Sequence, residues 1–530
     1  MATVRMAFTF MQQALFATAL CMAFALIGFE AAAQTSPSGR VEILNADRLD
    51  FDDHLAPGAQ RLIGNVRLKH VDALMFCDSA YLYPDQHVRA YGHVAIRQGD
   101  TLDLKADRLD YTGEKRVATV AGKVVLSDPG MTLTTEALTY DLTASRATYT
   151  DSARIESRRD GNTLTSRNGT YLTALHRFIF SGNVRIEHPE RLITADTLQY
   201  ATGTGVADFI GPTHITQNET HMYCERGTYD TRNNTGRFTR AGRITTQGRT
   251  LTGDSLLYDR TAGIGSGWGN VQVADSANDI LVRGNRGIYH EKQGSSMITG
   301  RAELLMPMNG DTLFLHADTL FASTDNVQGR NVTARRNVRF FKSDMQGTCD
   351  TMRYNTSDSL VRLRGNPMLW SATDQLTGDS MRLAIADGTP RSVIVDGSGF
   401  MVSPADSLHW NQVAGTVITG VFRDKELVQV TAEGNAQTAY FAREGKEKEG
   451  PLTNLNRADC ARLVLGLDSG QVHSVSFITQ PEATLWPLEK APPEEVKLEG
   501  FSWQPEARPT DREDIFREGE MRSRSVVPDN

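Results

Sequence analysis

The chain has 530 residues, a formal net charge of −8, and ordinary contents of 40% hydrophobic and 23% charged residues. A net negative charge argues against a nucleic-acid partner, which requires a clustered basic face. Length alone suggests several globular domains, but an internal repeat that covers most of the chain overrides that expectation.

Residues 1–33 are predicted to be a signal peptide. Arg5 precedes an apolar stretch at 14–29, and the alanines at 31–33 form a small-residue cleavage site. The apolar stretch is long for a signal peptide, so an uncleaved membrane anchor is the alternative. Either way, the body of the protein is exported. Nothing after residue 34 is apolar for long enough to span a bilayer as a helix.

A six-residue signature then recurs from residue 46 to residue 410. Its six positions hold, in order, a small residue, an acidic residue, two variable-to-apolar residues, any residue and an aromatic residue, as in Ala106–Tyr111. The steps between its acidic positions lie between 27 and 33 residues, most often 29. Such a period marks a stack of units that each contact mainly their neighbours. The acidic position falls at Asp47, Asp78, Asp107, Glu136, Arg167, Asp196, Glu225, Asp254, Asn285, Asp318, Asp350, Asp379 and Asp406.

The hydrophobic pattern around each signature predicts a bent β-strand. Apolar residues alternate at Leu102, Leu104 and Ala106, and then resume with the opposite parity at Leu109 and Tyr111. A strand with one buried face cannot change parity without a bend or a bulge. The acidic residue and its follower are therefore expected at a corner between two sheets, where Asp hydrogen-bonds nearby backbone amides.

A second element lies between the signatures and predicts a turn or bulge followed by a new strand. Glycine supplies the permissive backbone that such a site needs. The copies begin at Gly64, Gly92, Gly122, Gly182, Gly269, Arg336 and Gly434. We expect an all-β fold, an elongated β-jellyroll of about thirteen repeats near 29 residues each, made of antiparallel strands.

No constellation of residues indicates catalysis or a cofactor. The calcium-binding glycine-rich nonapeptide is missing, and one carboxylate per repeat is a poor metal cage. Cys77, Cys224 and Cys349 occupy the small position of the signature in distant repeats, so no disulfide is expected among them. No metal-ligand spacing recurs among the histidines, which include His54, His70, His176, His188, His214 and His316. We predict a non-enzymatic protein with no catalytic residue, metal or cofactor.

The remaining domain boundaries follow from composition. Residues 41–440 form the predicted repeat region, as one array or as two or more consecutive units. Residues 451–480 are interpreted as a degenerate last repeat or cap. Prolines and acidic residues accumulate from residue 487 onward, which predicts a disordered tail at 487–530.

The two repeated elements, Gly-Asn-Val before an alternating strand and Ala-Asp-x-Leu-x-Tyr, resemble those of the OstA-like family. That family includes LptA and the N-terminal domain of LptD, which act in lipopolysaccharide transport. The resemblance covers about residues 41–440 and implies a β-jellyroll folded like a taco. It also implies an apolar interior that keeps the acyl chains of the lipid away from water.

The groove-facing candidates are the apolar positions that share the inward parity. An open groove and a closed core are equally compatible with the sequence. The predicted lipid-binding residues are Leu102, Leu104, Leu109, Tyr111, Val124, Leu126, Leu133, Leu138, Val184, Ile186, Ile193 and Leu198.

The preferred function is a periplasmic lipid-binding conduit for lipopolysaccharide transport to the outer membrane, either free in the periplasm or associated with that membrane. The alternative is a β-solenoid surface adhesin or a glycan-acting protein. The expected partners are lipopolysaccharide or a related lipid and other transport proteins that pair through free sheet edges. Head-to-tail self-association would use the same edges. No nucleic-acid partner is expected.

Overall fold

The computed structural model describes residues 39–517, except 52–53, 55–56, 100–101, 277–278, 309, 325–329, 387, 425, 445–449 and 469–470. The chain divides into two compact units. Unit 1 contains residues up to 128 and residues 134–147, and unit 2 contains residues 129–133 and those from 148 onward. The predicted signal peptide lies outside the described residues. Among the described residues, no helix is both long and apolar enough to cross a membrane.

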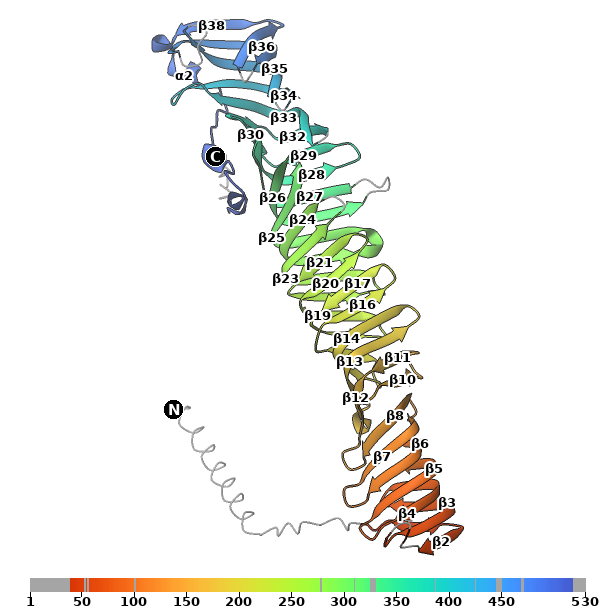
Figure 1. The fold of residues 1–530 in the computed structure, drawn as a ribbon. Coiled ribbons are helices and arrows are strands. Elements are labelled where there is room, and N and C mark those ends of the chain that lie inside the picture. Colours follow the sequence, from red (N-terminus) through yellow and green to blue (C-terminus); the bar gives the residue numbers. More distant parts are fainter. Residues whose placement is uncertain are drawn as a thin grey trace, which may run out of the picture. The chain divides into compact units, whose positions relative to one another are not determined.

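Both units consist of antiparallel strands that follow one another in chain order (Figure 1). Strands β8 (Met131–Asp141) and β9 (Arg146–Tyr149) contribute residues to both units. The strands of unit 1 are β1 (Glu42–Asn45), β2 (Arg48–Phe51), β3 (Gln60–His70), β4 (Ala73–Leu82), β5 (His87–Gln98), β6 (Leu102–Thr112) and β7 (Val117–Ser127).

Unit 2 holds the remaining strands. The first group is β10 (Ala153–Ser157), β11 (Thr163–Ser166), β12 (Asn168–Leu172), β13 (Arg177–His188), β14 (Arg191–Ala201), β15 (Val206–Phe209), β16 (Thr213–Gln217), β17 (Thr220–Cys224), β18 (Arg226–Asp230), β19 (Thr235–Arg240), β20 (Gly242–Thr246), β21 (Arg249–Gly253) and β22 (Ser255–Asp259). The second group is β23 (Ile264–Asp275), β24 (Ile280–His290), β25 (Ser295–Met308), β26 (Asp311–Thr324), β27 (Arg330–Lys342), β28 (Met345–Asn355), β29 (Leu360–Arg364), β30 (Met368–Ser371), β31 (Asp374–Thr377), β32 (Ser380–Ala386), β33 (Thr389–Pro404), β34 (Trp410–Arg423), β35 (Glu426–Arg443), β36 (Leu452–Asp468), β37 (Gln471–Ile478) and β38 (Glu482–Pro487).

The predicted change of parity is confirmed. In β6, Leu102, Leu104 and Ala106 are buried, two exposed residues follow at the acidic position, and Leu109 and Tyr111 are buried again. The register of β5 against β6 shifts at the same place, between Tyr91 and Val94. Each long strand therefore bends at a bulge and contributes to two sheet halves. Wall A is the half that contains the residues before each acidic position, together with the half-strands paired to them. Wall B is the other half.

The acidic residue stabilises the bulge of the following strand. Gly92 and His93 both have positive φ, of 76° and 41°, which the left-handed region permits readily for glycine. The carboxylate of Asp78 lies directly over Gly92 and accepts a hydrogen bond from His93 Nδ1 at 2.8 Å. Asp254 accepts one from Asn270 Nδ2 at 3.0 Å in the same way. At these sites the acid binds a side chain on the next strand, whereas the sequence predicted hydrogen bonds from nearby backbone amides.

The disordered-tail prediction is wrong for residues 488–517, which form η3 (Leu488–Lys490), α2 (Pro493–Val496), η4 (Pro505–Ala507) and η5 (Glu513–Phe516). Leu498 and Ile515 are buried, at 3% and 0% exposure. In Figure 1 this segment lies beside the strands of unit 2, and η5 contacts β26 and β27. Composition alone does not predict this order, because the few apolar residues of the segment become buried only against strands distant in sequence, as Leu498 does against Phe400 and Val402. Residues 518–530 lie outside the described part of the chain.

Candidate functional site

All twelve sequence-predicted groove residues are buried, with exposed fractions between 0 and 9%. In unit 1 these are Leu102, Leu104, Leu109, Tyr111, Val124, Leu126 and Leu138. In unit 2 they are Leu133, Val184, Ile186, Ile193 and Leu198. They point inward, as their parity predicted. None of them lines the three apolar cavities described below, so their part in binding stays a prediction.

Aromatic rings fill the interior around these residues. The aromatic position of the signature holds Tyr111, Tyr140, Tyr171, Tyr200 and Tyr229, and all five are almost fully buried. Tyr171 and Phe178 stack with ring centroids 4.2 Å apart, and Phe178 stacks on Phe180 at 5.0 Å. The interior of these repeats is therefore a packed core.

Hydroxyl groups of the same tyrosines join the rims of walls A and B. In unit 1, Tyr111 contacts His70 Nδ1 at 2.6 Å, and Tyr140 donates to Gln98 Oε1 at 2.6 Å. In unit 2, Tyr200 donates to Asp160 Oδ2 at 2.9 Å. Each of these three hydroxyls thus has a partner on the opposite wall, and we call this row of contacts the seam. The seam holds the two walls together in these repeats.

The interior opens in the later repeats of unit 2. Cavity I, about 150 Å³, is lined among others by Leu251, Val273 and Val282. Cavity II, about 350 Å³, is lined among others by Leu313, Met345 and Leu383. The two cavities share Ile280, Leu304 and Val332, so they are contiguous.

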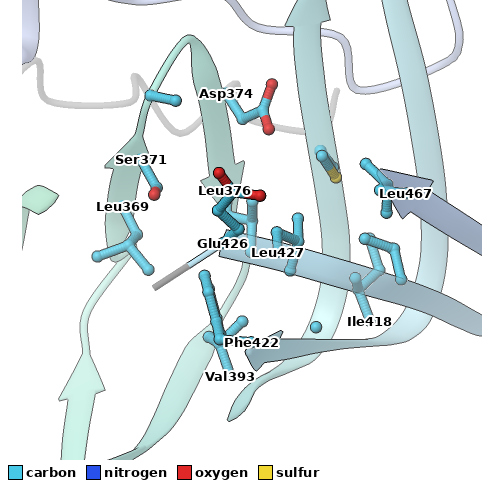
Figure 2. Close-up of a pocket in the computed structure, with 14 residues that line it drawn as sticks. Leu369, Ser371, Asp374, Leu376, Val393, Ile418, Phe422, Glu426, Leu427 and Leu467 are labelled. Carbon is cyan, nitrogen blue, oxygen red and sulfur yellow. The ribbon is translucent and has the colours of Figure 1, made fainter. Parts of the chain in front are cut away.

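Cavity III, about 220 Å³, lies among β30, β31 and β33–β36. Figure 2 shows Leu369, Leu376, Val393, Leu427 and Leu467 around it, with the carboxylates of Asp374 and Glu426 also on its lining. Burial raises the pKa of Asp374, although hydrogen bonds from Ser403 and Thr373 act in the opposite direction. A few polar groups around an apolar cavity are typical of small-molecule sites.

One apolar cluster connects these regions, from Val271 in β23 to Leu467 in β36. Several of its inward side chains are only partly buried, unlike the corresponding residues of the early repeats. They include Leu251, Val273, Ile280, Val282, Met306, Leu313, Val332 and Ile385. These are the binding candidates that the sequence interpretation missed.

Two features of the sequence mark this change. The position two residues before the bulge holds Phe180, Phe209 and Phe238, and then Gly267. The aromatic position of the signature holds Ala322 and Leu383 in later repeats. Small residues at inward positions leave space that the earlier rings fill.

Strand length also contributes. The two longest steps of the repeat, 33 and 32 residues, fall between Asn285, Asp318 and Asp350. Strands β25 and β26 have 14 residues each, whereas β6 has 11. Longer strands make deeper walls, and the extra inward residues Met306 and Leu313 line cavity II.

The arrangement defines a repetitive antiparallel β-jellyroll whose later repeats enclose a hollow apolar interior. Within the described ranges, no group of three or more His, Cys, Asp or Glu side chains is placed to hold a metal ion.

Comparison with protein families identifies the repeats. The model for OstA-like protein matches residues 38–196. The model for LptA/(LptD N-terminal domain) LPS transport protein matches residues 163–264 and 282–389. These matches confirm the resemblance to OstA-like domains that the sequence indicated. These matches support a periplasmic role related to lipopolysaccharide transport.

One similar solved structure is LptH, the LptA-homologous periplasmic component of the lipopolysaccharide transport device from Pseudomonas aeruginosa. The two chains are 13% identical, with a TM-score of 0.21, over 27% of this chain and 95% of LptH. No curated protein sequence matches the chain significantly. The assignment therefore rests on the two family models.

Proposed function

We propose that this chain is a non-enzymatic conduit that binds acyl chains of lipopolysaccharide, or of a related lipid, in cavities I–III of unit 2. The observation that carries the proposal is the apolar interior from Val271 to Leu467, in which cavities I and II are contiguous.

The energetics suit transfer. Each acyl methylene that leaves water gains about 0.8 kcal/mol, so ten of them gain on the order of 8 kcal/mol. Leu251, Val273 and Val282 offer similar apolar surface on successive strands. A lipid can therefore move between contacts of similar energy without being trapped in one deep energy minimum, which is what a carrier requires.

We also propose that strand edges join this chain to other transport proteins or to a second copy. In unit 1, Leu44, Leu49 and Phe51 of β1 and β2 are exposed. In unit 2, Val475 and Leu485 of β37 and β38 are exposed. An exposed apolar edge strand pairs readily with a strand of another chain.

Photo-crosslinking in cells tests the lipid proposal. A photoreactive residue at Val282 or Val332 is expected to label lipopolysaccharide, because both side chains line cavity I. The matched control is Arg353, which is exposed on β28 next to the inward-facing Met352. Equal labelling at Arg353 and Val332, or no lipid at either cavity position, would contradict the proposal.

Leu109 and Leu198 provide the second comparison. Both are buried, at 3% and 0% exposure, in repeats whose walls the seam joins. Weak labelling there with strong labelling at Val282 indicates that the lipid occupies only the later repeats. Strong labelling at all of these positions indicates that the seam opens during transport.

A further inference from the structure

A fourth cavity, about 490 Å³, lies on the seam of unit 2 and differs in chemistry from cavities I–III. Its lining includes three arginines, Arg159, Arg191 and Arg232, together with Asp160, Glu190 and His188. Arg159 and Asp160 follow β10, Arg191 begins β14, and Arg232 follows β18. Residues separated by up to 73 positions in the chain thus converge at one polar cavity.

One of the three guanidinium groups is neutralised. Arg232 Nε donates to Asp160 Oδ1 at 2.6 Å, and this hydrogen bond raises the pKa of Arg232. The Asp160 side chain is only 3% exposed. Its other oxygen accepts a hydrogen bond from Tyr200, whose pKa burial raises to about 12. Asp160 therefore serves as a fixed internal partner for Arg232.

The second guanidinium is held rigidly and keeps a spare donor. Arg191 is 5% exposed, and its Nη2 and Nη1 donate to Asn162 Oδ1 at 2.9 Å and Asn234 Oδ1 at 3.1 Å. Its Nε is buried without a hydrogen-bond partner. A buried charged group with an unused donor is costly unless a further acceptor is bound.

The third guanidinium, Arg159, makes no hydrogen bond or ion pair with any residue in the described part of the chain. The remaining carboxylate on the lining is Glu190, whose backbone N–H donates to His188 Nδ1 at 3.3 Å. The cavity thus has two arginines, Arg159 and Arg191, without a carboxylate partner.

We infer that this cavity is an oxyanion site for a phosphate group, held by the guanidinium groups of Arg159 and Arg191. Guanidinium groups match the geometry of phosphate oxygens, and charge-assisted hydrogen bonds are stronger than neutral ones. The phosphate has two sources, the headgroup of a bound lipid or free phosphate. The headgroup source rests on the proposed function, because its acyl chains occupy cavities I–III.

Binding of inorganic phosphate to the full chain, measured by calorimetry at low salt, tests the site. Arg159→Gln is expected to weaken binding about fivefold to tenfold. The substitution removes no intramolecular hydrogen bond or ion pair, because Arg159 makes none with the described residues. Arg191→Lys keeps the charge but removes the planar fork, so it is expected to weaken binding similarly. The control Arg237→Gln removes an exposed arginine from β19 and should leave binding unchanged. Thermal unfolding of each variant verifies that it folds.

Two lipid probes separate the sources. If lipopolysaccharide binds Arg159→Gln about fivefold more weakly than the parent, while phosphatase-treated lipopolysaccharide binds both equally, the ligand is the headgroup. If only inorganic phosphate depends on Arg159, the ligand is free phosphate. If neither probe depends on Arg159 or Arg191, the inference is wrong. Absence of labelling at Val282 and Val332 with phosphate binding retained would reject the conduit and keep the oxyanion site.

Discussion

At the scale of single residues, the bend in each strand depends on a pair formed across two strands. Asp78 lies over Gly92, and a Cβ on that glycine would overlap the carboxylate. The small residue, the acid and the glycine of the two sequence motifs are thus parts of one local structure. This gives the recurring acid a structural role at the bulge.

Replacing Gly92 with Ala is expected to destabilise unit 1 by about 2–4 kcal/mol, because strain at positive φ adds to a steric clash. Chemical denaturation measures the change. Gly99→Ala is the matched control, since Gly99 has a φ of 61° and open space around its Cβ position. That control should lose only about 1 kcal/mol, and equal losses in both variants would show that the contact with Asp78 is unimportant.

Stability is expected to fall as the pH rises from 10 to 12. Burial raises the pKa of Tyr111, Tyr149 and Tyr200 from 10.0 to about 12. The neutral form is favoured in the folded chain, so this contribution is complete below pH 10 and is lost as the pH passes through 12. Denaturation midpoints between pH 8 and pH 12 measure the effect.

The buried thiols act in the same direction, since burial raises the pKa of Cys77, Cys224 and Cys349 from 9.0 to about 12. Tyr200→Phe should therefore reduce the alkaline slope without abolishing it. An unchanged slope in that variant would mean that Tyr200 ionises equally in the folded and unfolded chain.

At the scale of elements, the segment 488–517 covers the outer face of wall A in unit 2. Buried glutamines bind its backbone from the strands. Gln412 donates to Val496 O at 2.9 Å and accepts from Leu498 N at 2.9 Å. Gln375 makes the equivalent pair with Ser502 O and Gln504 N. Strands β31 and β34 therefore have one face toward the cavities and the other under this segment.

Deleting residues 488–530 is expected to speed amide hydrogen exchange in β33–β36, because Phe400, Val402 and Phe441 lose their cover. Exchange in β3–β7 of unit 1 should not change. Deletion of 518–530 alone is the control and should preserve protection. Unchanged exchange in β33–β36 after the long deletion would show that the segment adds no stability.

At the scale of the whole molecule, the repeats share one backbone plan but differ in what their interiors contain. Rings and seam contacts fill the early repeats, whereas the repeats lining cavities I–III leave apolar space. A lipid carrier needs such space, and a fully packed array would provide none. This difference between the interiors of the repeats follows from side-chain volume, not from a change of fold.

Gly265→Leu is expected to fill part of cavity I and to reduce lipid labelling at Val282. A Cβ at Gly265 would lie 3.7 Å from Leu251 and 3.9 Å from Tyr258, which are ordinary contacts. Stability should therefore be retained or rise by about 1 kcal/mol. Gly265→Ala adds too little volume to matter and is the control. Full labelling at Val282 in Gly265→Leu would show that the lipid does not need the space beside Gly265.

The sequence by itself determined the repeat, the parity change at each bulge and the family, because these depend on residues close together in the chain. Leu102 and Leu198 were correctly expected to face inward, since alternation decides the face of a strand. The tertiary structure alone decided whether the inward face is filled. That outcome depends on volumes summed across both walls, such as Phe238 in one repeat and Gly267 in the next. The tertiary structure also decided that residues 488–517 are ordered, because their few apolar side chains become buried only against strands distant in sequence.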